Sequence, residues 1–141
     1  MTTRPGWLRP LVFGLVLAGL ILPLILYWLM VGRIPSVTAT EAKVLLGTQG
    51  AAARLVDVRP ASAYAEKHLE GADSWPYDQV MAASSPEQVP AGLRGRSLLL
   101  LCDSGILSSL ATRHLRTAGI ANAMNVDGGM QAWAGTADKP C

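Results

Sequence analysis

Cys102 is the residue of this chain whose type and position best suit covalent chemistry. It follows four leucines (residues 98–101) and precedes a short loop, DSGIL, after which the sequence is helical in character. If the loop curls around the sulfur, its N–H groups and the helix N-terminus stabilise a thiolate, a persulfide or an anionic substrate. Gly105 allows a close backbone approach that a larger residue would hinder. The pattern predicts the seat of a nucleophile.

The alternative is a structural role for Cys102, because free cysteines are among the most buried residues. Its context argues against that role. The segment SLLLL (residues 97–101) lacks polar alternation, which is typical of a central strand covered on both faces. Reactive groups usually lie at the carboxyl end of such a strand. A helix is expected to begin at Ser108 or Ser109 and to end at Gly119.

Residues 34–141 alternate strand and helix patterns. Strands are predicted at residues 34–37, 54–58, 73–75, 97–101 and 122–126. A capping box at Thr38 and Glu41 opens a helix through Leu46, which Gly47 and Gly50 end. Further helices are predicted at residues 61–67 and 130–133, and residues 84–96 form a surface connection. This alternation favours an α/β fold, with a mainly parallel sheet flanked by helices.

Residues 11–31 are a run of 21 residues without a charged side chain, long enough to cross a bilayer core of about 30 Å. The sequence therefore predicts a tail (residues 1–10), a transmembrane helix (residues 11–31) and a C-terminal domain (residues 34–141). The slight excess of positive charge before the helix favours a bacterial inner-membrane protein with that domain in the periplasm. A signal peptide cleaved after Ala39 is disfavoured, because such apolar cores usually span about 7 to 15 residues.

Charge and cysteine content exclude several classes of function. The formal net charge of +2 is spread without a basic block, so nothing indicates nucleic-acid binding. The two cysteines, Cys102 and Cys141, supply neither a disulfide framework nor a metal-binding CxxC pair. No metal site and no cofactor are expected. Cys141 is interpreted as an exposed chain end, with a thiol that resolves a Cys102 persulfide as the alternative.

Four ordered motifs, LVDVRP, HLEGA, CDSGILS and NVDGGMQAW, make residues 34–133 similar to a single-domain rhodanese, a sulfurtransferase. The resemblance implies a compact rhodanese-like α/β fold and a six-residue loop from Cys102 to Leu107. It also implies that Cys102 takes a sulfane sulfur from a donor, becomes a persulfide and passes the sulfur to a thiol or cyanide acceptor. The implied loop for substrate and anion binding consists of Asp103, Ser104, Gly105, Ile106, Leu107 and Ser108.

Two loop residues depart from the family pattern. Many active members have a basic residue directly after the cysteine and another near the loop's end, where this chain has Asp103 and Leu107. A carboxylate beside the thiolate opposes its ionisation and repels thiosulfate. The alternative is that Asp103 points into solvent, where its charge is screened. We expect weak activity with thiosulfate, or a neutral or thiol-based persulfide donor.

A related phosphatase loop is disfavoured. It requires an arginine in the pattern CxxxxxR to hold phosphate, and counting from Cys102 places Ser108 at that position. Nothing in the loop then supplies a bidentate grip on phosphate.

Three further residues are predicted to support the site. Asp57 and Arg59 match the family's DVR segment, with Asp57 capping the next turn and Arg59 bridging carboxylates or backbone. A direct contact of Arg59 with substrate is the less favoured alternative. His68 is expected to pack and hydrogen-bond rather than to act as an acid or base.

Two functions follow from these observations. The first is a membrane-anchored sulfurtransferase that works through a Cys102 persulfide. The alternative is a weakly active or inactive rhodanese-like module that binds a partner, such as a membrane protein, or senses sulfur or redox state. Fold resemblance alone does not establish activity.

Overall fold

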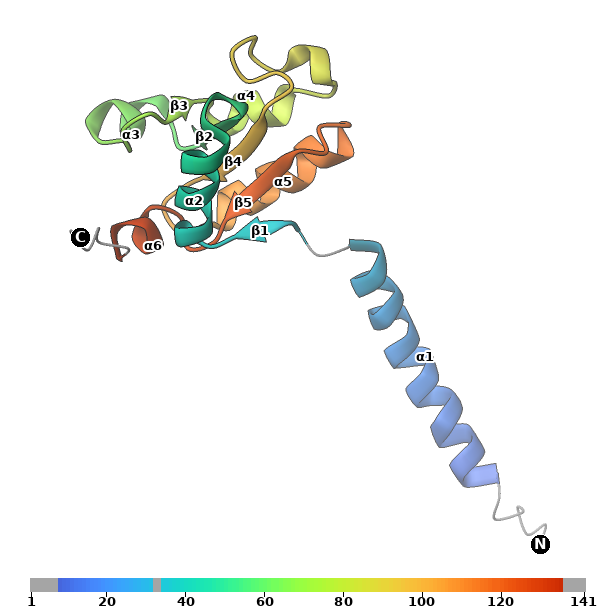
Figure 1. The fold of residues 1–141 in the computed structure, drawn as a ribbon. Helices are drawn as coiled ribbons and strands as arrows, with labels where there is room; N and C mark the ends of the chain where they lie inside the picture. Colours follow the sequence, from blue (N-terminus) through green and yellow to red (C-terminus); the bar gives the residue numbers. More distant parts are fainter. Residues whose placement is uncertain (1–7, 32–33, 136–141) are drawn as a thin grey trace, which may run out of the picture. The chain divides into compact units, whose positions relative to one another are not determined.

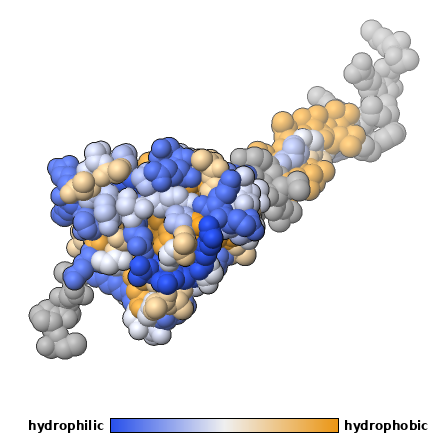
Figure 2. Space-filling view, turned by 90° about the horizontal axis from the view of Figure 1, so that it is seen from above, coloured by the Kyte–Doolittle hydropathy of each residue, from blue (hydrophilic) through white to orange (hydrophobic). Residues whose placement is uncertain are grey.

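The N-terminal apolar run forms helix α1 (Leu8–Val31) in this computed structural model, which describes residues 8–31 and 34–135 (Figure 1). Contacts divide the chain into two units, Met1–Arg33 and Ile34–Cys141. Apolar side chains of α1 such as Phe13 and Leu24 are exposed. Most of the described part of this helix is orange, the colour of hydrophobic residues, in Figure 2. Among the described residues, no helix has the length and hydropathy needed to cross a membrane. The transmembrane anchor predicted at residues 11–31 is therefore not supported there.

Within residues 34–135, five strands form one parallel sheet. They are β1 (Ser36–Val37), β2 (Ala53–Asp57), β3 (Asp73–Ser74), β4 (Ser97–Leu101) and β5 (Ala123–Val126). Their order is β1-β5-β4-β2-β3, and every neighbouring pair is parallel. β4 lies in the centre, paired along its whole length with β2. The predicted parallel sheet is thus confirmed.

Helices cover both faces of this sheet (Figure 1). Leu98 and Leu100 of β4 pack with Cys102 in a core completed by α4 (Tyr77–Ala82) and α5 (Ile106–Thr117). Leu99 and Leu101 point to the other face, under α2 (Ala39–Gln49), α3 (Ala61–Glu66) and α6 (Gly129–Gly135). All four leucines are fully buried. The uninterrupted leucine run thus reflects burial on both faces, as predicted.

One difference from the sequence-based expectation lies beside Cys102, at the start of α5. It begins at Ile106, not at Ser108 or Ser109. Gly105, in a left-handed conformation with φ of 89°, precedes the helix without any capping side chain. The serine signal was misleading because Ser108 lies inside the helix, where its hydroxyl contacts other buried groups.

Further differences concern the other helices. The Thr38 capping box is confirmed, but α2 continues through Gly47 to Gln49 and ends at Gly50. Helix α4 was not predicted, because its one-and-a-half turns bury only Val80 and show no clear periodicity. Two 3-10 helices, Gly50–Ala52 and Pro86–Gln88, were also not predicted. The connection at residues 84–96 runs over the surface, but Val89 and Leu93 anchor it in the core.

Candidate active site

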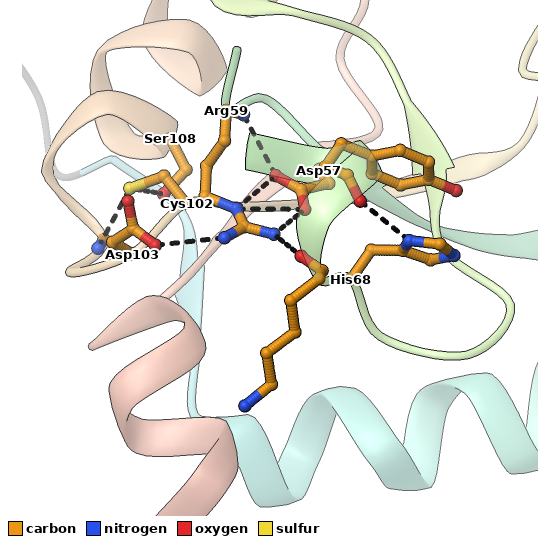
Figure 3. A network of polar contacts seen from close by, with 9 residues as sticks. Asp57, Arg59, His68, Cys102, Asp103 and Ser108 are labelled. Atoms are coloured by element: carbon orange, nitrogen blue, oxygen red, sulfur yellow. Dashed lines mark hydrogen bonds and ion pairs between the residues drawn. The ribbon is translucent and has the colours of Figure 1, made fainter. Parts of the chain in front are cut away.

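Cys102 lies directly after β4, at the carboxyl end of the central strand, with only 2% of its surface exposed. The backbone N–H of Gly105 donates to its Sγ at 3.1 Å, and the Ser108 Oγ lies 3.4 Å from the same sulfur (Figure 3). A Cβ on Gly105 would stand 2.9 Å from the backbone nitrogen of Gly128. Gly105 therefore provides both the positive φ and the space that the loop needs.

The surroundings of Cys102 favour its thiolate. Burial alone raises the pKa of the thiol, because a buried anion loses its hydration. Hydrogen bonds from the side chain and backbone of Ser108, and then from the N–H groups of Ser104 and Gly105, outweigh burial and lower the pKa below the ordinary value of 9.0. Cys102 is therefore a buried thiol that ionises more readily than a free cysteine.

The first turn of α6 holds the loop from the opposite side. The N–H of Met130 donates to the Cys102 carbonyl at 2.7 Å, and that of Gln131 donates to the Asp103 carbonyl at 3.1 Å. A trans peptide points its C=O and N–H in opposite directions, so the bond from Gln131 turns the N–H of Ser104 away from α6. Gly129 makes this approach possible, because a Cβ there would lie 2.2 Å from the Cys102 carbonyl oxygen.

Arg59 joins three segments of the domain. Its Nε and Nη2 donate to the Asp57 carboxylate at 2.7 to 3.1 Å, and its Nη2 also donates to the Lys67 carbonyl at 2.6 Å. Its Nη1 donates to Asp103 Oδ1 at 3.2 Å. The hydrogen bonds with Asp57 raise the pKa of Arg59, against the opposing effect of burial, and Asp103 raises it further. Arg59 is thus committed to carboxylates and backbone.

Asp103 does not lie free in solvent, which was one of the two positions considered from the sequence. Its side chain is 68% exposed, yet it is paired with Arg59 instead of pointing freely into solvent. Asp57 is fully buried against the same guanidinium. Two carboxylates on one guanidinium leave this cluster with one net negative charge beside the loop.

His68 lies beyond Asp57 as seen from Cys102 (Figure 3). Its Nδ1 is 2.8 Å from the Tyr64 carbonyl, and its ring stacks on that of Tyr64 with centroids 4.0 Å apart. The structure therefore does not bring His68 to the sulfur. Ile106 and Leu107, at the start of α5, are exposed and give the loop an apolar rim.

Asn125 is a site residue that the sequence analysis missed. It is buried in β5, where its Oδ1 accepts the Ser108 hydroxyl at 2.7 Å. A polar residue in the otherwise apolar strand end was the available signal, but the motif NVDGG was used only for the resemblance. Among the described residues, no group of three or more His, Cys, Asp or Glu could hold a metal ion. Cys141 lies outside the described residues.

Comparisons with known proteins agree with this geometry. Residues 38–136 match the family model of the rhodanese-like domain. The human single-domain sulfurtransferase TSTD1 superposes with a TM-score of 0.61 at 26% identity, covering 74% of this chain and 98% of that one. The rhodanese homologue TT1651 of Thermus thermophilus gives a TM-score of 0.54 at 33% identity, covering 70% and 100%.

A curated relative, the adenylyltransferase and sulfurtransferase MOCS3-2 of Zea mays, is 33% identical over 109 residues, or 72% of this chain and 21% of that protein. The chain spans less than half the length of the curated relatives it matches. The family match covers most of the chain and agrees with the parallel sheet and the cysteine loop. The protein belongs to the family of rhodanese-like domains.

Proposed function

We propose that the protein is a sulfurtransferase in which Cys102 carries the sulfur as a persulfide. The observation that carries this proposal is the seat of Cys102, where a loop amide and the Ser108 hydroxyl face a buried sulfur whose thiol pKa is lowered. A thiolate is the form of cysteine that attacks sulfur. The relationship to sulfurtransferases supports the same chemistry.

The reaction balances in two steps. The Cys102 thiolate attacks the outer sulfur of a donor persulfide, R–S–SH. A new S–S bond forms to Cys102, and the donor's own S–S bond breaks, so that R–S⁻ leaves with the electron pair. An acceptor thiolate or cyanide then attacks the outer sulfur on Cys102, and the Cys102 thiolate is released as the leaving group.

The charges beside the loop favour a persulfide of a thiol over thiosulfate as the donor. Asp103 and Asp57 share one guanidinium, so this cluster beside the loop keeps a net negative charge that opposes a compact dianion. The exposed side chains of Ile106 and Leu107 offer contact with apolar parts of a larger donor. Arg59 has no role in holding substrate in this proposal, because its guanidinium is held by Asp57, Asp103 and the Lys67 carbonyl.

The test is intact-mass spectrometry of the 141-residue chain with Cys141→Ser, so that Cys102 is its single thiol. The protein is incubated separately with glutathione persulfide and with thiosulfate, and Cys102→Ser serves as the control. We expect one added sulfur that cyanide removes, more with the persulfide than with thiosulfate, and none in the control. No added sulfur on a folded, reduced protein contradicts the proposal.

That negative result would favour the second candidate, a rhodanese-like module that binds a partner or senses sulfur. The pairing of Arg59 with Asp103 is the observation that favours it, because it neutralises a guanidinium that would otherwise attract an anionic substrate. The two candidates differ in whether Cys102 gains sulfur, and the same mass measurement separates them.

We further propose, from the sequence alone, that residues 11–31 attach the protein to a bacterial inner membrane with its domain in the periplasm. The run has no charged side chain, and its length suits a bilayer core. Extraction of membranes with alkaline carbonate tests the attachment, and reporters fused to the C-terminus test the orientation. Release of the protein by carbonate contradicts the attachment. A signal only from a reporter that works in the cytoplasm contradicts the orientation.

A further inference from the structure

A buried chain of polar groups runs from Cys102 into β5. The Ser108 Oγ lies 3.4 Å from the Cys102 sulfur and 2.7 Å from Asn125 Oδ1. Asn125 Nδ2 lies 2.9 Å from Asp127 Oδ1 and 3.3 Å from the Ser36 hydroxyl. Ser108 and Asn125 are almost entirely buried, at 0% and 3% exposure. The hydrogen bond between these two buried groups therefore matters, because water does not replace a partner lost there.

The direction of these hydrogen bonds follows from Asp127, the carboxylate at the end of the chain of polar groups. The Asp127 carboxylate accepts hydrogen bonds, so the amide nitrogen of Asn125 faces it and the amide oxygen faces Ser108. An amide oxygen cannot donate, and the bond at 2.7 Å therefore uses the hydroxyl proton of Ser108. With that proton engaged, Ser108 presents lone pairs to Cys102 and can accept from an S–H group.

Ionisation of Cys102 reverses this arrangement. A thiolate has no proton to donate and needs one from Ser108, but a hydroxyl has a single proton. To stabilise the thiolate, Ser108 must turn its proton from Asn125 to the sulfur. Asn125 Oδ1 then loses its donor inside the protein, which costs free energy. The sulfur and the amide oxygen thus compete for one proton.

We infer that Asn125 is a positioning residue for Cys102, because its amide oxygen competes with the Cys102 sulfur for the hydroxyl proton of Ser108. This competition sets how readily the sulfur becomes and remains a thiolate. In sulfur transfer, which rests on the function proposed above, the same competition acts twice. The thiolate is the attacking group in the first step and the leaving group in the second. In the intervening persulfide the inner sulfur is neutral, and the Ser108 proton returns to Asn125.

Other charged groups surround the site but stay unchanged in the test. Asp103, paired with Arg59, lies on the loop, and Asp127 stands behind Asn125. Asp57 and His68 lie on the far side of Arg59 (Figure 3). The residues of α5 and α6 that hydrogen-bond to Cys102 or to its loop, among them Ser108, Met130 and Gln131, are neutral. Substitution of Ser108 or Asn125 alters none of these charges.

The experiment measures the pH midpoint of Cys102 alkylation by iodoacetamide in the full-length Cys141→Ser protein. Ser108→Ala removes the donor, and Asn125→Leu removes the competing acceptor. Asn125→Ala is made in parallel, so that the result does not depend on how leucine packs. Ser108→Ala combined with each Asn125 variant completes the set, and circular dichroism verifies that each variant is folded.

We expect opposite shifts from the two residues. Ser108→Ala raises the midpoint, and Asn125→Leu or Asn125→Ala lowers it. Each changes the ionised fraction below the midpoint by about threefold to tenfold, the worth of one hydrogen bond. In the Ser108→Ala background, the Asn125 substitutions have no further effect, because the proton that they release is absent.

Two results would overturn the inference. One is an Asn125 variant that leaves the midpoint unchanged or raises it, and the other is an Asn125 effect that persists without Ser108. Alkylation does not require sulfur transfer, so the outcome is independent of the proposed function. Persulfide formation, measured by mass on the same samples, reports separately whether the transfer itself fails.

Discussion

Two polar networks lie on either side of the Cys102 loop, and they differ in what they contact. The guanidinium network, made of Asp57, Arg59 and Asp103, ties β2 and the α3 region to the loop without a hydrogen bond to the sulfur. The hydroxyl network, Ser108 and Asn125, reaches the sulfur directly. The difference indicates that the charged network holds the loop in place and affects which donors approach it. The neutral hydrogen bonds act on the ionisation of Cys102.

The largest effect is expected from breaking the guanidinium network at its centre. Arg59→Met leaves the fully buried Asp57 carboxylate without its partner, and removing one partner of a buried ion pair costs about 3–5 kcal/mol. We expect a loss of that size in the free energy of unfolding, measured by urea denaturation. The matched control is Asp103→Asn, which removes the exposed partner and changes stability by less than about 1 kcal/mol.

If Arg59→Met proved as stable as Asp103→Asn, the guanidinium network would not be structural, and a substrate-binding role for Arg59 would return. Arg59→Lys sharpens the test, because a single ammonium cannot reproduce the bonds to Asp57, Lys67 and Asp103 together. It should recover only part of the loss.

A second substitution addresses the backbone that lies between the networks. Gly129→Ala places a Cβ only 2.2 Å from the Cys102 carbonyl oxygen, which is too close for two non-bonded atoms. Overpacking of this kind costs roughly 1–3 kcal/mol. We expect the free energy of unfolding, measured by urea denaturation, to fall by an amount in that range. Alkylation of Cys102 should also be slower, because the displaced loop amides no longer stabilise its thiolate. Gly135→Ala is the control, since a Cβ there meets no atom of the described residues within 4 Å.

A weaker effect is expected from the charge of Asp103, which bears on the choice of sulfur donor. Asp103→Asn removes the carboxylate and leaves Arg59 Nη1 with a weaker partner, which favours an anionic donor. We expect the rate of persulfide formation from thiosulfate to rise on the order of tenfold, or about 1.4 kcal/mol, with less change for glutathione persulfide. Glu66→Gln removes an exposed carboxylate from α3 and controls for net charge. Equal gains from both variants would contradict a local role for Asp103.

The sequence was informative where one signal dominated. The leucine run predicted the central strand at residues 97–101, and the structure places β4 at those residues. The capping box of Thr38 and Glu41 likewise predicted the start of α2. These signals are local or depend on burial alone, and tertiary contacts do not override them.

The networks were harder to predict, because each joins residues far apart in the sequence. Arg59 and Asp103 are 44 positions apart, and Ser108 and Asn125 are 17 apart. Their pairing depends on the strand order, which places β2 and β5 on either side of β4. Ser108 was misread as a helix start for the same reason, since its hydroxyl serves a neighbouring strand rather than a helix cap.

The smallest expected effect is a difference between the two networks in how the free energy of unfolding depends on pH. Burial raises the pKa of the Cys102 thiol, but the hydrogen bonds from Ser108 and from the loop amides outweigh burial, so that this pKa lies below 9.0 in the folded protein. A depressed pKa stabilises the fold above the unfolded value, and this contribution is lost as the pH falls through the folded value. The free energy of unfolding, relative to Cys102→Ser, should therefore rise as the pH approaches 9. The guanidinium network should show no such slope, because Arg59 stays protonated. Loss of the slope in Ser108→Ala would assign it to the hydroxyl network, and an unchanged slope would assign it to the loop amides.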